Sequence, residues 1–268
     1  FGPEGLKLLR EGNAPVQAAE RLGESDTGIQ HRQIGIIDTH GRSAAFTGEK
    51  CIAYAGHVAS ADGIRGAAGG GGLYFSAQAN MMLNNGVPEA MAEAFFRDPG
   101  KASNEAAEEP LWNFAGRLLA ALQGAERAGG DIRGRQSAHI IILPFKKPAE
   151  PWKGKLMDLR VEDNRDPVQE LGRLIRIHRA YAYSDEGDRA MERGDVDTAL
   201  NVFGRAEELH PEEIELVYWH AVALADAGKI DEARPLFRRV FTADPNWREL
   251  TRRLPDAGLI NFDPLDIE

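Results

Sequence analysis

Two stretches in the last third of this 268-residue chain match each other at a constant spacing of 34 residues. They are "ERGDVDTALNVFGRAEELHP" (192–211) and "DAGKIDEARPLFRRVFTADP" (226–245). Among the identical residues that fall in register are Gly194 and Gly228, Ala199 and Ala233, Phe203 and Phe237, and Pro211 and Pro245. A constant period of this length predicts a stacked helical repeat, because each unit must bury its apolar face against its neighbour.

Each repeat is expected to be a pair of antiparallel helices. Glycine suits the turn between the helices, alanine lets their backbones approach closely, and proline ends the second helix. The pattern resembles the tetratricopeptide repeat, with repeats at about 181–211 and 212–245 and a capping helix at 246–258. The first helix fits less closely, since the small residue expected there is Gly187 in one repeat and Ala221 in the other.

The repeats leave two interpretations open. Two repeats are fewer than the roughly three that usually fold alone, so we expect them to pack against the preceding domain. They form either a docking surface for a partner protein, or a structural appendage or self-association face with a solvated acidic exterior. We expect the protein to be a homo-oligomer.

The charge of the chain changes near residue 180. Residues 1–180 hold 22 Lys and Arg against 22 Asp and Glu, whereas residues 181–268 hold 10 against 20. The whole formal charge of −10 therefore lies in the last third. This step predicts one domain at 1–180 and a repeat domain at 181–268. Because no basic stripe is present, we do not expect a nucleic-acid partner.

Other bulk features exclude further classes of protein. No apolar run approaches the roughly 18 residues that span a bilayer, so we expect no membrane-spanning segment. The single cysteine, Cys51, excludes a disulfide framework and a cysteine-rich metal site. It is compatible with a reducing compartment, and we expect a cytoplasmic protein without a cofactor.

The first 180 residues combine short strands with helices. Periodicity predicts helices at 5–12, 14–22, 87–96, 108–130 and 167–181, and strands at 33–48 (a hairpin), 51–58, 73–80, 138–143 and 155–161. Asn13 is expected to cap the second helix, and the Gly/Ala-rich stretch 59–72 is expected to be a mobile loop. Hairpins beside a helical block indicate the α+β class.

Several longer motifs of these residues are familiar in one bacterial family. In order they are "GPEGLKLLREG", "RQIGIIDTHGRSAAFTGEKC", "AGH", "AQANMM", "AMAEAF", "AGGDIRGRQSA", "DLRVEDNRDPV" and "ELGRLIRIH". They resemble the domain-of-unknown-function family numbered 1028, usually placed in the Ntn-hydrolase-like superfamily. The resemblance covers residues 1 to about 180 and implies an αββα sandwich, in which two sheets stack between helical layers.

The resemblance also bears on the start of the chain and on its chemistry. Family members carry some tens of residues before the matched segment, so the chain is expected to be truncated at its N-terminus, and a signal peptide is not excluded. An Ntn hydrolase uses an N-terminal Thr, Ser or Cys as nucleophile and its α-amine as base. Phe1 has no nucleophilic atom, so the nucleophile is expected upstream. The resemblance thus implies an amide-bond hydrolase, and the alternative is a non-catalytic module that binds a small polar ligand.

The stretch "AGGDIRGRQSAHIIIL" (128–143) offers candidate substrate-binding residues. Its polar lead holds Asp131, Arg133, Arg135, Gln136 and Ser137 at the mouth of a predicted strand. Arginine there can clamp a carboxylate, and Gln or Ser can donate to an oxyanion. The alternative is a plain turn held by an Asp–Arg pair.

A second group of candidates lies on the predicted hairpins. Thr47 with the Gly48 amide could bind a substrate carbonyl, or could simply end a strand. Cys51 and His57 would share one face of a strand as a nucleophile pair, although a buried structural cysteine is commoner. Gln78 and Asn80 alternate on a strand and either face a cleft or satisfy a sheet edge. His40, His57 and Asp62 lack any recognised ligand spacing, so no metal site is expected.

Overall fold

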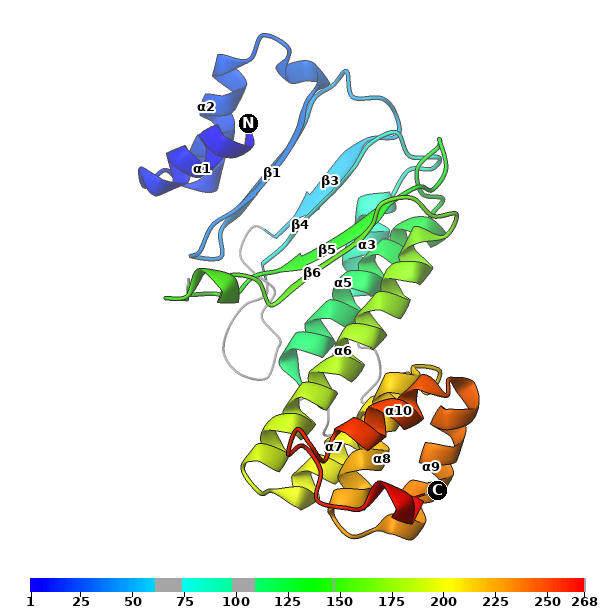
Figure 1. Ribbon diagram of the computed structural model, residues 1–268. Helices are drawn as coiled ribbons and strands as arrows, with labels where there is room; N and C mark the ends of the chain where they lie inside the picture. Colours follow the sequence, from blue (N-terminus) through cyan, green and yellow to red (C-terminus); the bar gives the residue numbers. More distant parts are fainter. Residues whose placement is uncertain (61–73, 98–108, 147, 268) are drawn as a thin grey trace. The chain divides into compact units, whose positions relative to one another are not determined.

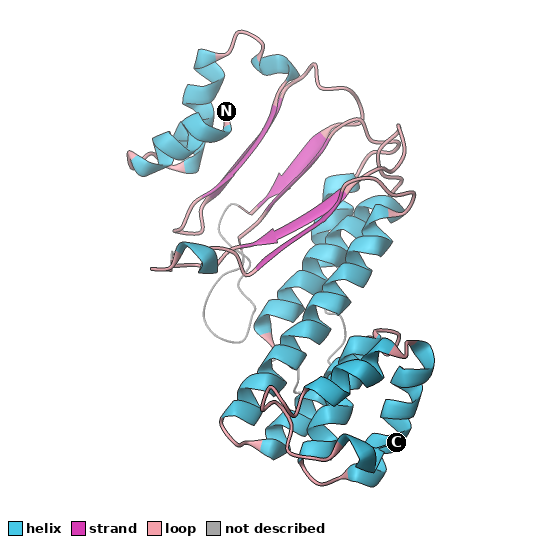
Figure 2. Cartoon of the chain, in the orientation of Figure 1, coloured by secondary structure: helices cyan, strands magenta, loops and turns pink. Residues whose placement is uncertain are grey.

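The computed structural model describes residues 1–60, 74–97, 109–146 and 148–267. The chain divides into two compact units, Phe1–Leu171 and Gly172–Glu268. Figure 1 labels the elements and Figure 2 distinguishes helices from strands. Most of the Gly/Ala-rich stretch that we expected to be a mobile loop lies outside the described residues.

The first unit begins with two helices that cover a hairpin. These elements are α1 (Gly2–Arg10), α2 (Pro15–Ser25), β1 (Gln33–Ile37) and β2 (Ser43–Thr47), with the one-turn helix η1 (Ile29–His31) between α2 and β1. The strands pair antiparallel from Gln33↔Thr47 to Ile37↔Ser43. Leu8, Ala18, Leu22 and Ile34 form a small apolar core between helices and hairpin. Strand alternation sends Ile34 toward the helices and its neighbours Gln33 and Gly35 to the other face.

One expectation about these helices is wrong. Asn13 does not cap α2, because its Nδ2 donates to the Leu8 carbonyl at 2.9 Å and so closes the end of α1. The start of α2 is instead capped by Gln17, whose Oε1 accepts from the Ala14 amide at 2.9 Å. A side chain within the first turn thus replaces the expected cap.

A second hairpin and a helix pair complete the layers. They are β3 (Gly56–Ala59), β4 (Ser76–Ala79), α3 (Val87–Phe96) and α5 (Pro110–Arg127). The hairpin β3–β4 contacts β1–β2 on one side and α3 on the other, and α3 packs along α5. The order helix, sheet, sheet, helix can be followed in Figure 1. The α+β class and its αββα layering are therefore confirmed.

The unit ends with a third antiparallel hairpin and the start of a long helix. The hairpin is β5 (Ala138–Ile142) and β6 (Met157–Val161), with η2 (Pro151–Lys153) in its connection. Helix α6 then runs through Pro167–Glu192, further than the expected 167–181. The division between the two units falls inside α6, and the domain boundary near residue 180 stays a prediction.

The second unit is all-helical and keeps the 34-residue period. After α6 come α7 (Val196–Leu209), α8 (Ile214–Asp226), α9 (Ile230–Ala243), α10 (Asn246–Arg253) and η3 (Pro264–Ile267). Gly194 and Gly228 both adopt φ of +75°, which explains glycine at both helix turns. At Gly187 a β-carbon would lie 2.6 Å from the Phe203 ring, so only glycine fits there.

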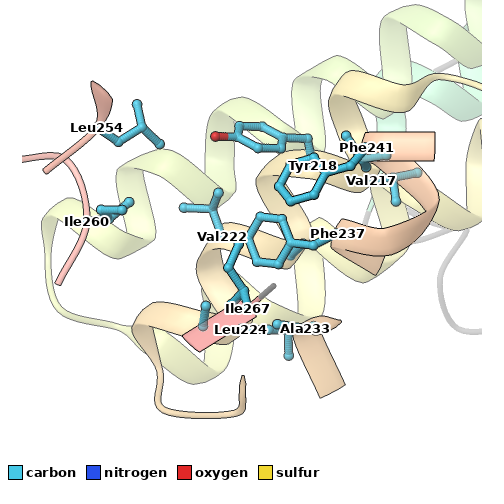
Figure 3. Close-up of a cluster of buried hydrophobic side chains, with 13 residues drawn as sticks. Val217, Tyr218, Val222, Leu224, Ala233, Phe237, Phe241, Leu254, Ile260 and Ile267 are labelled. Carbon is cyan, nitrogen blue, oxygen red and sulfur yellow. The ribbon is translucent and has the colours of Figure 1, made fainter. Parts of the chain in front are cut away.

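The core of this unit is large and aromatic. Tyr218 and Phe237 are fully buried with their ring centroids 6.0 Å apart, and Phe237 also packs on Phe241. Figure 3 shows Leu254, Ile260 and other apolar side chains around them. The Tyr218 hydroxyl meets Thr251 Oγ1 of α10 at 3.0 Å, so the capping helix satisfies the one polar atom that the ring buries.

Candidate functional site

One cleft of the first unit gathers most of the predicted site residues. It measures about 810 Å³ and is lined from the ends of β1 and β4, the start of α3, the end of α5 and the segment 129–137. The predicted residues among its lining are Gln78, Asn80, Asp131, Arg133, Arg135, Gln136 and Ser137. Thr47 and His57 do not line it, but lie in a separate recess of about 490 Å³. The volume of the cleft is within the usual range for small-molecule sites.

Two glycines build the turn that forms one wall of the cleft. Gly129 and Gly130 have φ of +121° and +64°, and a β-carbon on Gly129 would collide with the Asn84 side chain. Asn84 Nδ2 donates to the Ala128 carbonyl at 3.0 Å, and the Leu83 amide donates to Gly130 O at 2.9 Å. Segment 128–137 is therefore a tight turn held against the segment after β4, which confirms the turn interpretation.

The residue after Asn80 has an uncommon backbone conformation. Met81 adopts φ of 58°, a region that residues other than glycine rarely enter. Its amide donates to Ile52 O at 3.0 Å and its carbonyl accepts from the Ile132 amide at 2.8 Å. Such residues persist where surrounding contacts impose them, and they cluster at functional sites. Met81 lies between Asn80 and Met82, which both line the cleft.

The charged residues of the turn form hydrogen bonds and ion pairs with carboxylates of the same unit. Asp131 Oδ1 accepts from the Arg133 amide at 2.8 Å and from its Nε at 3.0 Å, while Oδ2 accepts from Nη2 at 2.6 Å. The Arg133 guanidinium keeps the pKa of the Asp131 carboxyl below its ordinary value, mainly through the side-chain hydrogen bonds. Arg135 lies between two carboxylates, with Nε 3.2 Å from Glu126 and Nη1 3.3 Å from Asp166. Both guanidinium groups therefore already have carboxylate partners.

The centre of the site is a glutamine that the sequence analysis did not select. Gln33 Nε2 lies 2.9 Å from Thr47 Oγ1 and 3.0 Å from each of the carbonyl oxygens of Gly56 and Ala79, so its two N–H groups are shared among three acceptors. Asn80 Nδ2 in turn donates to Gln33 Oε1 at 3.1 Å. One side chain of β1 thus connects β2, β3 and β4. The sequence "QIGII" did contain a signal: strand alternation places Gln33 on the opposite face from Ile34 and Ile36, the face that contacts the second hairpin.

Gln78 reaches the same inter-sheet space from β4. A β-carbon at Gly35 would overlap its amide group, so the glycine provides the room that the long side chain fills. Its Nε2 donates to Ser76 Oγ on the same strand. Gln78 and Asn80 therefore belong to the polar interior and also line the cleft, as one of the two sequence interpretations predicts.

The second recess holds a hydroxyl beside an imidazole. Thr47 Oγ1 and His57 Nδ1 are 2.8 Å apart, and Gln33 donates to the same hydroxyl oxygen. The alternative of a cysteine–histidine pair is wrong, because β3 begins only at Gly56 and the Cys51 thiol donates to Arg32 O at 3.3 Å. Cys51 is half-buried, not the fully buried structural residue that we considered commoner. The Gly48 amide cannot bind a substrate carbonyl either, since it donates to Arg32 O at 2.9 Å.

The described residues give no metal centre. They contain no group of three or more His, Cys, Asp or Glu side chains that could hold an ion. Asp62, which the sequence analysis weighed as a ligand, lies outside the described residues, and the His40 amide donates to Asp38 Oδ1 in the β1–β2 turn. No helix in the described part of the chain has the length and apolar character that a membrane span requires.

Comparison with known families finds a match in each of the two units. The model of a family of unknown function, DUF1028, matches residues 1–171. The chain belongs to this family. A tetratricopeptide-repeat model matches residues 184–246. Both resemblances inferred from the sequence motifs are therefore confirmed, while the family's description names no activity.

One solved structure and the curated proteins complete the comparison. The crystal structure of protein SPO2555 from Silicibacter pomeroyi, assigned to DUF1028, is 30% identical with a TM-score of 0.48. The match covers 65% of this chain and 64% of that one, so the chain spans less than two thirds of that protein. None of the curated proteins matches the chain significantly.

Proposed function

We propose that the cleft binds an amide substrate and that the complete protein is an amide-bond hydrolase of the Ntn type. The observation that carries the proposal is the set of uncharged polar side chains that the fold gathers there: Gln33, Gln78, Asn80, Gln136 and Ser137. Such groups can donate to a substrate carbonyl or accept from its N–H. The αββα layering supports the proposal, since the superfamily resemblance implies that architecture.

The proposal divides the chemistry between this chain and a residue outside it. The nucleophile is the first residue of the mature protein, whose hydroxyl or thiol attacks the amide carbon while its α-amine accepts the proton. The amine leaves with that proton, and water then releases the acyl group. Gln136 and Ser137, whose side chains form no hydrogen bond with other described residues, are the proposed donors to the oxyanion. Thr47 and His57 remain candidates for contacts at the neighbouring recess, and Asp131 and Arg135 fix the cleft wall.

A non-catalytic binding module is the second candidate, and one observation favours it. The described residues that line the cleft include one hydroxyl that could act as a nucleophile, that of Ser137, and it has no hydrogen bond to a base among the described residues, so the described lining holds no nucleophile–base pair of its own. A protein whose cleft only binds a small polar ligand needs no such pair. In either case we propose that the repeats supply a docking or self-association surface. The homo-oligomer and the cytoplasmic location stay predictions.

The deciding experiment is the intact mass and N-terminal sequence of the protein expressed from its complete reading frame. The hydrolase requires a mature chain that starts with Thr, Ser or Cys. It also requires hydrolysis of members of a panel of small anilides, with a loss of about 10³-fold or more when that residue becomes Ala. A mature chain with any other first residue overturns the Ntn mechanism and leaves the binding module.

A further inference from the structure

The orientation of the Gln33 amide is fixed by its neighbours. Its nitrogen lies within 3.0 Å of two backbone carbonyl oxygens, those of Gly56 and Ala79. A carbonyl oxygen can only accept a hydrogen bond, so the atom facing both must be the NH₂ group. The Gln33 oxygen therefore has to point the other way, toward Asn80.

The orientation of the Gln33 amide determines which atom of the Asn80 amide remains available for a ligand. Gln33 Oε1 is an acceptor, so Asn80 must present its own NH₂ group, and the two atoms are 3.1 Å apart. Asn80 Oδ1 then has no hydrogen bond to any described residue, on a side chain that lines the cleft. The backbone carbonyls of β3 and β4 thus orient the Gln33 amide, and Gln33 in turn orients the Asn80 amide so that its oxygen faces the cleft as an acceptor.

The charges around the cleft do not favour an anion at this acceptor. Arg133 is held by Asp131, and Arg135 by Glu126 and Asp166, so each guanidinium already has a carboxylate partner. A ligand carboxylate near Asn80 Oδ1 would meet another acceptor, and the nearest guanidinium groups are already neutralised by protein carboxylates. A neutral N–H donor would instead complete the hydrogen bonds of Asn80. The preference therefore comes from one hydrogen bond gained by the amide against one acceptor–acceptor contact made by the carboxylate.

We infer that the cleft selects an uncharged ligand with an N–H donor, a carboxamide, against the corresponding carboxylate, because Gln33 fixes Asn80 Oδ1 as an acceptor. The inference rests on the proposed function only in taking the cleft as the binding site. It names the substrate class of the hydrolase and equally the ligand class of a binding module. Asn80 is the specificity-determining residue, and Gln33 is a positioning residue that acts through it.

The test compares a matched pair of probes at neutral pH, propionamide and propionate, by ligand-observed NMR titration of the full chain. The two differ only in a terminal amide or carboxylate. We expect the amide to bind at least about 10-fold more tightly, the ratio for one satisfied against one unsatisfied hydrogen bond. Equal binding, tighter binding of the carboxylate, or no binding of either probe overturns the inference.

Two isosteric variants locate the effect. Asn80→Asp removes the donor to Gln33 and should abolish the amide preference. Asn84→Asp is the control, since it makes the same change nearby and breaks a hydrogen bond to Ala128, while Asn84 is not among the residues that line the cleft. An equal loss in both variants would mean that added charge or a disturbed turn causes it, and the inference fails.

Gln33 has a readout that does not depend on a ligand. In the unmodified chain its side-chain NH₂ protons should exchange slowly with solvent, because they are bonded to carbonyls between the sheets. Fast exchange would overturn the assigned orientation even if Asn80→Asp fails to fold. Binding is measured without turnover, so a mature protein that lacks an N-terminal nucleophile would end the hydrolase proposal without affecting the amide preference.

Discussion

The space between the two hairpins of the first unit and the core of the repeat unit are built from opposite materials. Between the hairpins Gln33, Thr47 and His57 are joined by hydrogen bonds, and Gln78 bonds to Ser76 of its own strand. In the repeat unit the corresponding space is filled by fully buried rings and aliphatic side chains (Figure 3). An apolar core tolerates imprecise neighbours, whereas a polar interior is stable only if each donor meets an acceptor.

This difference indicates that the candidate site belongs to the first unit and that the repeat unit is specialised for packing. A polar network costs stability when it is incomplete, so a fold that keeps one between its sheets has a use for the groups at its edge. The repeat unit uses its sequence for packing, and its 34-residue period requires the same small and aromatic residues twice. Three measurements test this contrast between the units.

The largest effect is expected from the aromatic core of the repeat unit. Phe237→Ala should lower the free energy of unfolding by about 3–5 kcal/mol, because it removes a fully buried ring and leaves a cavity. Urea unfolding, followed by the fluorescence of Trp219 and Trp247, measures the change. Leu265→Ala is the control, since that side chain is 72% exposed and its loss should be nearly neutral. A Phe237→Ala effect below about 1 kcal/mol would contradict a tightly packed core.

A smaller effect is expected where two helices of the first unit touch. Gly124→Ala in α5 would place a β-carbon 2.7 Å from Ala90 O and 2.8 Å from Ala94 Cβ of α3. Because backbone must move, we expect a loss of about 1–3 kcal/mol in thermal or urea unfolding. Gly116→Ala on the same helix meets no described atom within 4 Å and should instead stabilise by up to about 1 kcal/mol. Similar results at both positions would show that α3 and α5 are not in close contact.

The smallest effect concerns how the two units respond to pH. Burial raises the pKa of Asp226 in the repeat unit, whereas hydrogen bonds from Lys155, His139 and Arg160 lower the pKa of Asp158 in the first unit. Asp226 therefore favours the folded state below its unfolded pKa of about 3.9, and this stability is lost as pH rises through the raised value. Asp158 acts oppositely, since its stability is present above about 3.9 and is lost as pH falls toward the lowered value.

Two amide variants test these signs by thermal unfolding between acidic and neutral pH. Asp226→Asn should gain stability relative to the unmodified chain as pH rises, by less than about 1 kcal/mol once solvent screening is allowed for. Asp158→Asn should lose stability relative to the unmodified chain over the same rise. Parallel curves for both variants would refute the contrast between the two units.

The elements that the sequence predicted well are those whose signals are local. Helical spacing and the glycine turns placed the repeats, and alternation placed the hairpins, because these patterns depend on near neighbours. Asn13 was misjudged because the end of the preceding helix, at the Leu8 carbonyl, competes for its side chain. Cys51 was misjudged because the strand begins only at Gly56 and the partner of its thiol, Arg32, lies 19 residues away along the chain. Of the candidate site, Asn80 and segment 131–137 were found as polar residues at strand ends.

Gln33 could not be found in this way. Its role depends on carbonyls 23 and 46 residues away, which only the stacking of two hairpins brings within reach. A glutamine at the start of an apolar strand has no local signature for such a role. The orientation of the Asn80 amide depends on Gln33 in turn, so the hydrogen-bonding character of the cleft could not be predicted from sequence patterns.

The fit of Gln78 over Gly35 has a consequence for how the family can vary. A side chain at position 35 and a long one at position 78 exclude each other, because both would occupy the same volume. A substitution at Gly35 alone would have to displace the Gln78 amide, the far end of a flexible side chain, and a shorter residue at 78 would remove the conflict. Although 43 positions apart, the two sites are therefore expected to evolve as a linked pair.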